Sequence, residues 1–168
     1  MWQAADYHPL KGKDYWDALN RDLGNLLSFD EPAITTLSNA AAFIFNVLED
    51  INWAGFYLFD DKKLILGPFG GKPACTTIAL GSGVCGTAAH EKRTVIVPDV
   101  EAFPGHIACD GDSRSEIVIP LIDKSGNLIG VLDIDSPNLN RFSNDDGAGL
   151  ESLAAVVISK LRLPINDW

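Results

Sequence analysis

Three cysteines lie within residues 75–109, and the 168-residue chain has no others. The preceding segments are Gly-Pro-Phe-Gly-Gly-Lys-Pro-Ala for Cys75, Gly-Ser-Gly-Val for Cys85 and Phe-Pro-Gly-His-Ile-Ala for Cys109. Glycine and proline mark turns and the ends of elements, so each sulfur atom is expected where a reagent can reach it. An odd number of cysteines also argues against a permanent disulfide framework. The pattern indicates redox, nucleophilic or metal-binding chemistry.

Three acidic residues could supply protons to such chemistry. Asp133 and Asp135 are two positions apart on a predicted strand, so both side chains leave the same face. Glu116 lies on the neighbouring strand of the same hairpin, beside a long loop. Crowding over a cavity would keep one carboxyl protonated near neutral pH, and a protonated acid can donate to a substrate oxygen. The alternative is an exposed polar face.

Trp53 and Tyr57 share one face of another predicted strand, with Gly55 between them. Because Gly55 has no side chain, this arrangement would leave space for a ligand beside the two rings. Aromatic pairs on strands also pack in protein cores. The residues alone leave both the pocket and the core interpretation open.

The string Gly81-Ser-Gly83-Val-Cys85-Gly86 matches the pattern G-x-G-x-x-G ahead of a predicted helix. A dinucleotide site would also require repeated βαβ units and an acid about 20 residues further on, and the chain lacks this context. A tight turn into a helix is therefore the preferred interpretation. Near the start of that helix, Cys85 would feel the helix dipole, which lowers the pKa of a thiol.

His106 precedes Cys109 by three residues, and together with the other cysteines it could complete a structural zinc site. The spacing between Cys75 and Cys85 argues against zinc, because zinc ribbons hold their cysteines two to four residues apart. A Cys–His hydrolase is a further alternative, but it would leave two cysteines and the acids without a role. We predict no metal site.

Helices are expected at both ends of the chain. The first follows an apolar stripe that runs to Leu27, and the second begins with Asp30 as its N-cap and Pro32 in its first turn. The last helix is expected after Ser143, with Asp146 completing a capping box. These helices would flank the strands between them.

The segment between the terminal helices has the period of two that is typical of strands. Strands are expected at residues 53–59, 63–67, 76–80, 94–97, 115–122 and 128–135. A short helix with Ser82 as its cap separates the third and fourth strands, and a long loop covers residues 98–113. This order predicts one α+β domain, residues 1–168, with a central antiparallel sheet flanked by N-terminal and C-terminal helices.

Composition restricts the classes of partner. The net charge is −10 and no cluster of lysine and arginine is present, which disfavours nucleic acids and anionic membrane surfaces. The N-terminal sequence does not resemble a signal peptide, and no apolar stretch approaches the length of a membrane span. With three cysteines in a reducing compartment, we expect a cytoplasmic protein.

Seven segments carry a resemblance to a known family. They read Asn52-Trp-Ala-Gly-Phe-Tyr57, Leu66-Gly-Pro-Phe-Gly-Gly-Lys-Pro-Ala-Cys75, Gly83-Val-Cys-Gly-Thr-Ala88, Pro98-Asp-Val, Phe103-Pro-Gly-His-Ile-Ala-Cys-Asp110, Ser115-Glu116-Ile and Gly130-Val-Leu-Asp-Ile-Asp-Ser136. Together they resemble the free methionine-(R)-sulfoxide reductases, which are stand-alone GAF-domain enzymes. The resemblance covers residues from about 13 to 162, which we take as the core of the domain. Gly70 departs from it, since glutamine is more usual there.

The resemblance implies a role for each cysteine. Cys109 corresponds to the catalytic nucleophile and Cys75 to the principal resolving cysteine, while Cys85 corresponds to a third that can also lie within disulfide reach of Cys109. The oxidation would proceed through a sulfenic acid on Cys109 and then a disulfide. Thioredoxin, supplied with electrons by NADPH, is the implied reductant, and no bound cofactor is implied.

The resemblance also implies how substrate is held. Trp53 and Tyr57 match aromatic residues that hold the substrate methyl group. The acids that would bind the substrate amine and polarise the sulfoxide are Glu116, Asp133 and Asp135. Either Glu116 or Asp135 could donate the proton. The family commonly forms homodimers, and it takes free methionine-(R)-sulfoxide and not protein-bound residues. The alternative function is a non-catalytic GAF domain that senses a small ligand.

Overall fold

Six strands form one sheet in the order β3-β2-β1-β6-β5-β4, and every neighbouring pair is antiparallel. The structure is a computed structural model and describes residues 5–107 and 110–162. The strands are β1 (Trp53–Phe59), β2 (Lys63–Gly71), β3 (Thr77–Ala79), β4 (Val95–Val97), β5 (Ser115–Ile122) and β6 (Leu128–Ser136). The helices are α1 (Gly12–Leu26), α2 (Ala33–Val47), α3 (Gly83–Glu91), α4 (Asn144–Lys160) and the 3₁₀ helix η1 (Val100–Ala102). This architecture confirms the predicted α+β fold.

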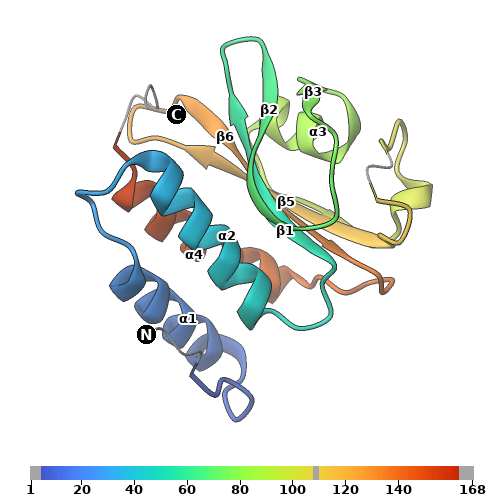
Figure 1. Cartoon of the computed structure of the whole chain (residues 1–168). Coiled ribbons are helices and arrows are strands. Elements are labelled where there is room, and N and C mark those ends of the chain that lie inside the picture. The colour runs from blue at the N-terminus through green and yellow to red at the C-terminus, as the bar shows by residue number, and fades with distance from the viewer. Residues whose placement is uncertain (1–4, 108–109, 163–168) are drawn as a thin grey trace.

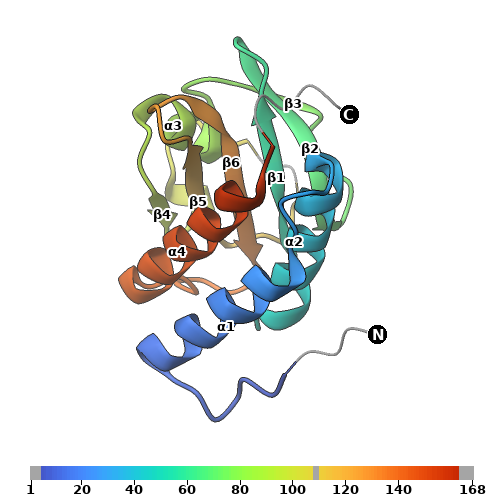
Figure 2. The same cartoon turned by 90° about the vertical axis from the view of Figure 1, so that its left-hand side faces the viewer.

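Helices cover the sheet unequally. Figure 1 shows α1, α2 and α4 together on one face of the sheet and α3 on the opposite face. Figure 2 shows the three-helix side turned toward the viewer, with α4 and α2 lying across β5, β6 and β1. Among the described helices, none combines the length and the apolar character that a bilayer crossing demands.

Alternation along β6 explains why the two faces differ. Leu132 and Ile134 are fully buried against the three helices, as the period of two predicts. Asp133 and Asp135 point to the other face, where α3 lies. Across the sheet, Asp135 is the register partner of Glu116 on β5 and of Trp53 on β1. The central strands therefore bring two acids and an aromatic side chain into one row.

The start of α3 is the tight turn that the glycine-rich string predicted. The backbone N–H of Gly81 donates to the carbonyl oxygen of Gly86 at 2.8 Å. A Cβ atom at Gly86 would lie 2.3 Å from the carbonyl oxygen of Ala79, so only glycine fits there. Ser82 is the N-cap residue, although its side chain makes no capping hydrogen bond. The antiparallel sheet around this turn is not a dinucleotide-binding fold.

The capping predictions had mixed outcomes. The capping box of α4 is confirmed, since the Ser143 side chain accepts a hydrogen bond from the Asp146 backbone N–H and the Asp146 carboxylate accepts one from the Ser143 backbone. The prediction for α2 was wrong: Pro32 is the N-cap residue, and Asp30 lies two residues before Pro32. The extended backbone of Pro32 delays the helix to Ala33.

Two segments predicted as loops contain regular structure. Strand β2 continues to Gly71, four residues beyond the predicted end, and pairs with β1 through a bulge between Gly55 and Tyr57. The second segment, residues 98–113, includes the 3₁₀ helix η1. The Asp99 side chain caps this helix by accepting a hydrogen bond from the Glu101 backbone N–H at 3.1 Å. The longer β2 changes the surroundings of the aromatic pair, as described below.

Candidate active site

A narrow cavity of about 30 Å³ lies on the α3 side of the sheet. It is lined by residues from the central strands, the turn into α3 and the segment before β5: Tyr57, Ile78, Ser82, Gly83, Val84, Cys85, His106, Ile107, Asp110, Ser113, Glu116, Asp133 and Asp135. Five of the eight residues singled out from the sequence are among them. A space of this size has room for about one or two water molecules.

The three predicted acids converge in this cavity. Glu116 and Asp133 are each only 6% exposed, which excludes the alternative of an exposed polar face. The side chain of Asp135 accepts a hydrogen bond from Ser113. Among the described residues, Oδ1 of Asp133 has no hydrogen-bond partner. The strand register therefore assembles a buried cluster of carboxyl groups.

Burial dominates the ionisation of these acids. It raises the pKa of Glu116 well above its usual value, and the charges of Asp133 and Asp135 raise it further. Burial followed by the charge of Asp133 also raises the pKa of Asp135 well above its usual value. For Asp133, burial raises the pKa to about 6. The prediction that crowding keeps a carboxyl protonated near neutral pH agrees with all three directions.

Cys85 lies beside the acids and does not have the lowered pKa that its position near a helix start suggested. Its side chain is 4% exposed, and its Sγ lies 3.9 Å from Oε1 of Glu116. Burial raises the pKa of the thiol well above its usual value, and the charges of Asp133 and Glu116 raise it further. These effects outweigh the helix dipole, so that prediction was wrong.

The aromatic pair packs closely, but the space expected at Gly55 is absent. Trp53 and Tyr57 stack with their ring centroids 6.0 Å apart. Phe69 also stacks with Trp53, and the centroids of these two rings are 5.3 Å apart. A Cβ atom at Gly55 would lie 2.3 Å from Cβ of Phe69 and 2.7 Å from the Trp53 ring. The longer β2 strand places Phe69 opposite Gly55, and this fills the predicted gap. Tyr57 lines the cavity, whereas Trp53 packs behind it.

Of the other two cysteines, Cys75 belongs to the described residues. Cys75 is partly buried beyond the end of β2, and the Tyr57 hydroxyl donates a hydrogen bond to its carbonyl oxygen at 3.0 Å. Cys109, the predicted nucleophile, lies outside the described residues. Its nearest described neighbours in the chain, Ile107 and Asp110, both line the cavity.

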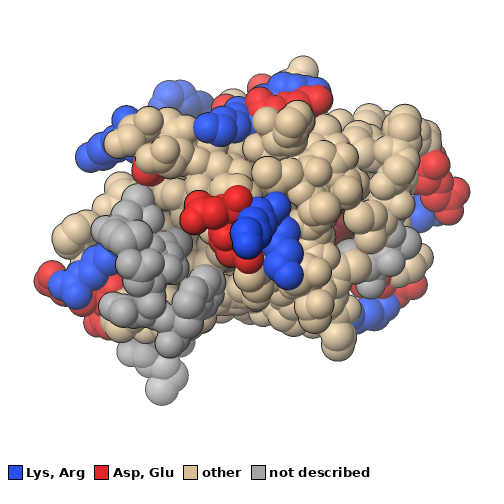
Figure 3. Space-filling model, turned by 90° about the horizontal axis from the view of Figure 1, so that it is seen from above, with Lys and Arg blue, Asp and Glu red and all other residues tan. Residues whose placement is uncertain are grey.

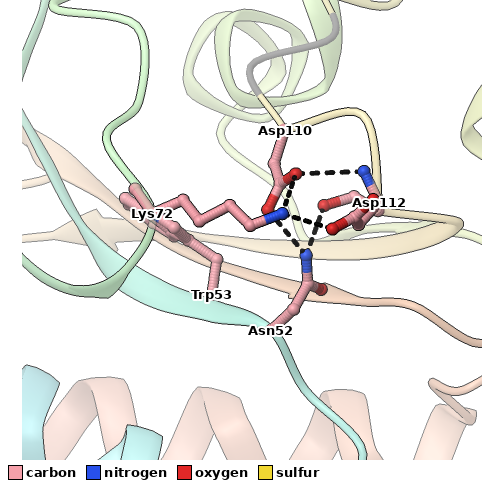
Figure 4. Close-up of polar contacts among 6 residues, drawn as sticks. Asn52, Trp53, Lys72, Asp110 and Asp112 are labelled. Carbon is pink, nitrogen blue, oxygen red and sulfur yellow. Dashed lines mark hydrogen bonds and ion pairs between the residues drawn. The ribbon is translucent and has the colours of Figure 1, made fainter.

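A polar network that the sequence analysis missed lies at the edge of the cavity (Figure 4). Asn52 Nδ2 donates to Asp110 Oδ2 at 3.1 Å and to Ser113 Oγ at 3.0 Å. The Lys72 ammonium pairs with Asp110 at 3.3 Å and also with Asp112. These contacts lower the pKa of Asp110, and the largest cause is its hydrogen bond from the Asp112 backbone N–H. The length and composition of residues 98–113 marked this segment as functional, but its partners are far away in the sequence.

Charged side chains of both signs are mixed on the surface. On the face that Figure 3 shows, the described lysine and arginine side chains are scattered, and most lie beside an acidic side chain. That face has no continuous basic surface among its described residues, such as a nucleic-acid backbone would require.

Comparisons with known proteins agree with the geometry. Residues 35–158 match the family model of the GAF domain. The free methionine-R-sulfoxide reductase of Escherichia coli (strain K12) is 49% identical over 142 residues, 84% of this chain and 86% of that protein. The protein of the same name from Saccharomyces cerevisiae is 50% identical over 131 residues, 74% of this chain and 73% of that protein.

A solved structure extends the similarity to three dimensions. The free methionine-R-sulfoxide reductase of Neisseria meningitidis, in complex with its substrate, has a TM-score of 0.82 at 39% identity, covering 95% of this chain and 93% of that chain. The chain therefore belongs to the GAF domain family and, within it, to the free methionine-R-sulfoxide reductases.

Proposed function

We propose that this protein is an oxidoreductase that reduces free L-methionine-(R)-sulfoxide to L-methionine, with Cys109 as the attacking thiol. The observation that carries the proposal is the cavity lined by three carboxyl groups, two of them buried, and also by Ile107 and Asp110, which flank positions 108–109. Family membership supplies the substrate class. The cavity supplies the acid that the reaction requires.

The first step transfers the sulfoxide oxygen to Cys109. A sulfoxide sulfur becomes electrophilic when its oxygen is protonated, so a protonated Glu116 or Asp135 donates to the oxygen while the Cys109 thiolate attacks the sulfur. The attack forms a transient S–S bond; the protonated oxygen then passes to the Cys109 sulfur as the S–O and S–S bonds to the substrate sulfur break, and methionine leaves with its sulfur reduced by two electrons. Cys109, oxidised by two electrons, becomes a sulfenic acid. The raised pKa values of Glu116 and Asp135 suit a group that must carry a proton near neutral pH.

The second step regenerates the thiol. The Cys75 thiol condenses with the Cys109 sulfenic acid to a disulfide, and one water molecule leaves. A dithiol reductant such as thioredoxin then reduces the disulfide by exchange. Cys85 serves as the alternative resolving cysteine; its buried position and raised pKa favour Cys75 for the main role.

The acid cluster also accounts for a preference for the free amino acid. A free substrate brings an ammonium group that can pair with the carboxylates of the cluster, whereas a residue inside a peptide has none. The cavity of about 30 Å³ is lined by three such carboxyl groups, so it suits a small free amino acid better than a bulky peptide. Ile107, which lines the cavity beside Gly83, is 41% exposed and so lies between the cavity and solvent.

The ammonium would also assist the nucleophile. Carboxylates near Cys109 in the sequence and in the cluster oppose thiolate formation, and a bound ammonium offsets part of their field. We therefore expect the pKa of the Cys109 thiol to fall when methionine binds. Titration of Cys109 in a Cys75→Ser/Cys85→Ser protein, with and without methionine, tests this, and an equal pKa in both would contradict it.

The central experiment is thioredoxin-coupled NADPH consumption with each epimer of free methionine sulfoxide. The wild type should consume NADPH with the R epimer, and neither the S epimer nor methionine sulfoxide inside a peptide should serve. Cys109→Ser should lose turnover entirely, while Cys75→Ser should still form one methionine per protein in a single turnover. Absence of activity on both free epimers would instead favour a ligand-sensing GAF domain.

Assembly and location complete the proposal. We infer a homodimer and a cytoplasmic location, which the family resemblance supports. Sedimentation of the purified protein tests the dimer, and a single species with the mass of one chain would contradict it.

A further inference from the structure

Three potential metal ligands meet on the floor of the cavity. Ligand atoms of Cys85, Glu116 and Asp133 all lie within 4.8 Å of one another. Their side chains are 4%, 6% and 6% exposed, so water cannot easily neutralise the charge that they would carry. Among the described residues, the one basic side chain within ion-pair distance of the cluster is His106, whose Nε2 lies 3.8 Å from Oε2 of Glu116.

A second observation indicates that the cluster lacks a partner. Oδ1 of Asp133 is buried and accepts no hydrogen bond from any described residue. Buried polar atoms without a partner are rare in folded proteins and cost free energy. Because Asp133 lines the cavity, a positively charged ligand in the cavity would provide the missing partner.

We propose that Cys85, Glu116 and Asp133 bind a thiophilic divalent cation such as Zn²⁺. Cysteine sulfur and carboxylate oxygen are ordinary zinc ligands, and tetrahedral bonds of about 2.3 Å and 2.0 Å place sulfur and oxygen about 3.5 Å apart. The observed separation of Cys85 Sγ and Glu116 Oε1, 3.9 Å, is close to this value. Binding forms a metal–sulfur bond and releases the thiol proton to solvent, without any change of oxidation state.

The fourth position can be filled by His106. Its imidazole lines the same cavity and is 17% exposed. Nε2 approaches the cluster from the loop before β5, so a small movement of that loop would complete a Cys-His-carboxylate set. This set differs from the three-cysteine site considered from the sequence, because it uses one cysteine and the acids of the strands.

The ligand set favours one class of cation. Thiolate sulfur selects zinc and its heavier relatives, whereas Mg²⁺ and Ca²⁺ require six or more oxygen ligands. The cavity of about 30 Å³ leaves little room for the water molecules that Mg²⁺ retains. We therefore expect strong binding of Zn²⁺ and Cd²⁺ and no binding of Mg²⁺ at the same site.

The site overlaps the position where the substrate ammonium would bind. If the proposed reductase function is correct, a bound cation and methionine compete for the same carboxylates. Zinc would then hold the enzyme inactive until it is removed. This consequence rests on the proposed function, whereas cation binding itself does not.

Cadmium titration tests the site directly. In a Cys75→Ser/Cys109→Ser protein, Cys85 is the one thiol left, so the ultraviolet charge-transfer absorption of a cadmium–thiolate bond reports on Cys85 alone. We expect one Cd²⁺ per chain and release of about one proton. The absorption should persist in excess Mg²⁺, and it should disappear when Zn²⁺ displaces Cd²⁺ from the site. Absence of the absorption would overturn the proposal.

Two acid variants separate a built site from a lone thiol. Asp133→Asn and Glu116→Gln in the same background should each weaken Cd²⁺ binding by at least about tenfold. Asp61→Asn, the same change on an exposed turn, should not weaken it. Thermal unfolding identifies any variant that fails to fold, and Glu116→Gln then carries the test. Binding that is unchanged in the acid variants would show a thiol complex only and would overturn the proposal.

Free L-methionine provides the last comparison. Added to the cadmium-loaded protein, it should reduce the charge-transfer absorption in proportion to its occupancy. Persistence of the absorption at saturating methionine would overturn the competition. The reductase activity is measured separately with the wild-type enzyme, so failure of either proposal can be told from failure of the other.

Discussion

The two faces of the sheet are formed by the same strands but carry different kinds of side chain. On the helix-covered face, Ile117, Leu132 and Ile134 are fully buried in a continuous apolar core. On the α3 face, their sequence neighbours Glu116 and Asp133 are buried as well and Asp135 is half-buried, but these are ionisable groups with raised pKa values. One residue along a strand therefore separates a stabilising side chain from one whose burial costs free energy.

This difference indicates how the fold can maintain the acid cluster. Burial of apolar side chains under three helices stabilises the central strands, and these strands then hold the acids at fixed register positions. The α3 face has its own apolar cluster, which includes Val118 and Val131, but the acids interrupt it. Variants on the helix face should therefore change stability, and variants on the α3 face should change chemistry.

Of the variants on the two faces, Asp135→Asn is expected to have the largest effect. The amide occupies nearly the same volume but cannot donate a carboxyl proton or carry a negative charge. If Asp135 is the proton donor, kcat for the R epimer should fall by about 10² to 10⁴. Steady-state kinetics with the thioredoxin-coupled assay measure the change.

Glu116→Gln is the matched comparison. If the amide variant of one acid mainly lowers kcat, that acid is the proton donor. If the amide variant of the other mainly raises KM, that acid acts in substrate binding. Both variants should keep the unfolding midpoint of the wild type or exceed it, because each removes a buried acid. Wild-type kcat in both variants would contradict a catalytic role for this face.

On the helix face, Leu132→Ala should reverse the pattern. The substitution leaves a void under the helices and should lower the free energy of unfolding by about 2 to 5 kcal/mol. Because Leu132 points away from the cavity, kcat should stay near the wild-type value where the protein is folded. Urea unfolding and activity at low temperature measure both quantities, and Leu132→Met, which conserves volume, should cost less than about 1.5 kcal/mol.

The pH dependence of stability should report the buried acids. An acid with a higher pKa in the folded protein binds its proton more tightly there, so its protonation stabilises the fold. For Asp133, this stabilisation is present below the ordinary pKa of 3.8 and is lost as the pH rises to about 6. The shift corresponds to about 3 kcal/mol.

Asp133→Asn should remove this part of the pH profile. Urea unfolding at several pH values, with EDTA present to exclude metal ions, compares the variant with the wild type. The free energy of unfolding of the variant, relative to that of the wild type, should increase as the pH rises from 3.8 to about 6. Asp61→Asn on the exposed turn should show no such trend, and parallel profiles for Asp133→Asn and the wild type would contradict the shift.

The sequence predicted local features well and long-range contacts poorly. Alternation in residues 128–135 placed Asp133 and Asp135 on one face because side-chain direction is a local property of a strand. The capping box of α4 was likewise readable from Ser143 and Asp146 alone. Identification of these residues as candidates required no knowledge of the fold.

The errors arose where a distant segment decides the outcome. Gly55 looked open because residues 68–71 were expected in a loop, but β2 continues and brings Phe69 over it. Cys85 was expected to have a lowered pKa from its own helix, but burial and two acids from other strands raise it. Neither partner can be deduced from the residues near the affected position.

The smallest effect is expected at the border between the two kinds of surface, from Lys72→Met. Lys72 follows β2 and pairs with Asp110 and Asp112 in the segment that lines the cavity. Its side chain is 58% exposed, so solvent screens these pairs and they should contribute little to global stability. The local effect should be larger, because the ion pairs join two segments that few apolar contacts hold together.

Hydrogen exchange can separate these contributions. In Lys72→Met, amides of residues 110–113 should exchange a few times faster than in the wild type, while those of β5 and β6 should not change. High salt should increase the exchange rate of the same amides in the wild type, because salt screens exposed charge pairs. Lys62→Met, on the turn between β1 and β2, is the matched control and should have no effect at residues 110–113. Equal exchange in the two variants would mean that apolar packing, as on the helix face, holds this edge of the cavity.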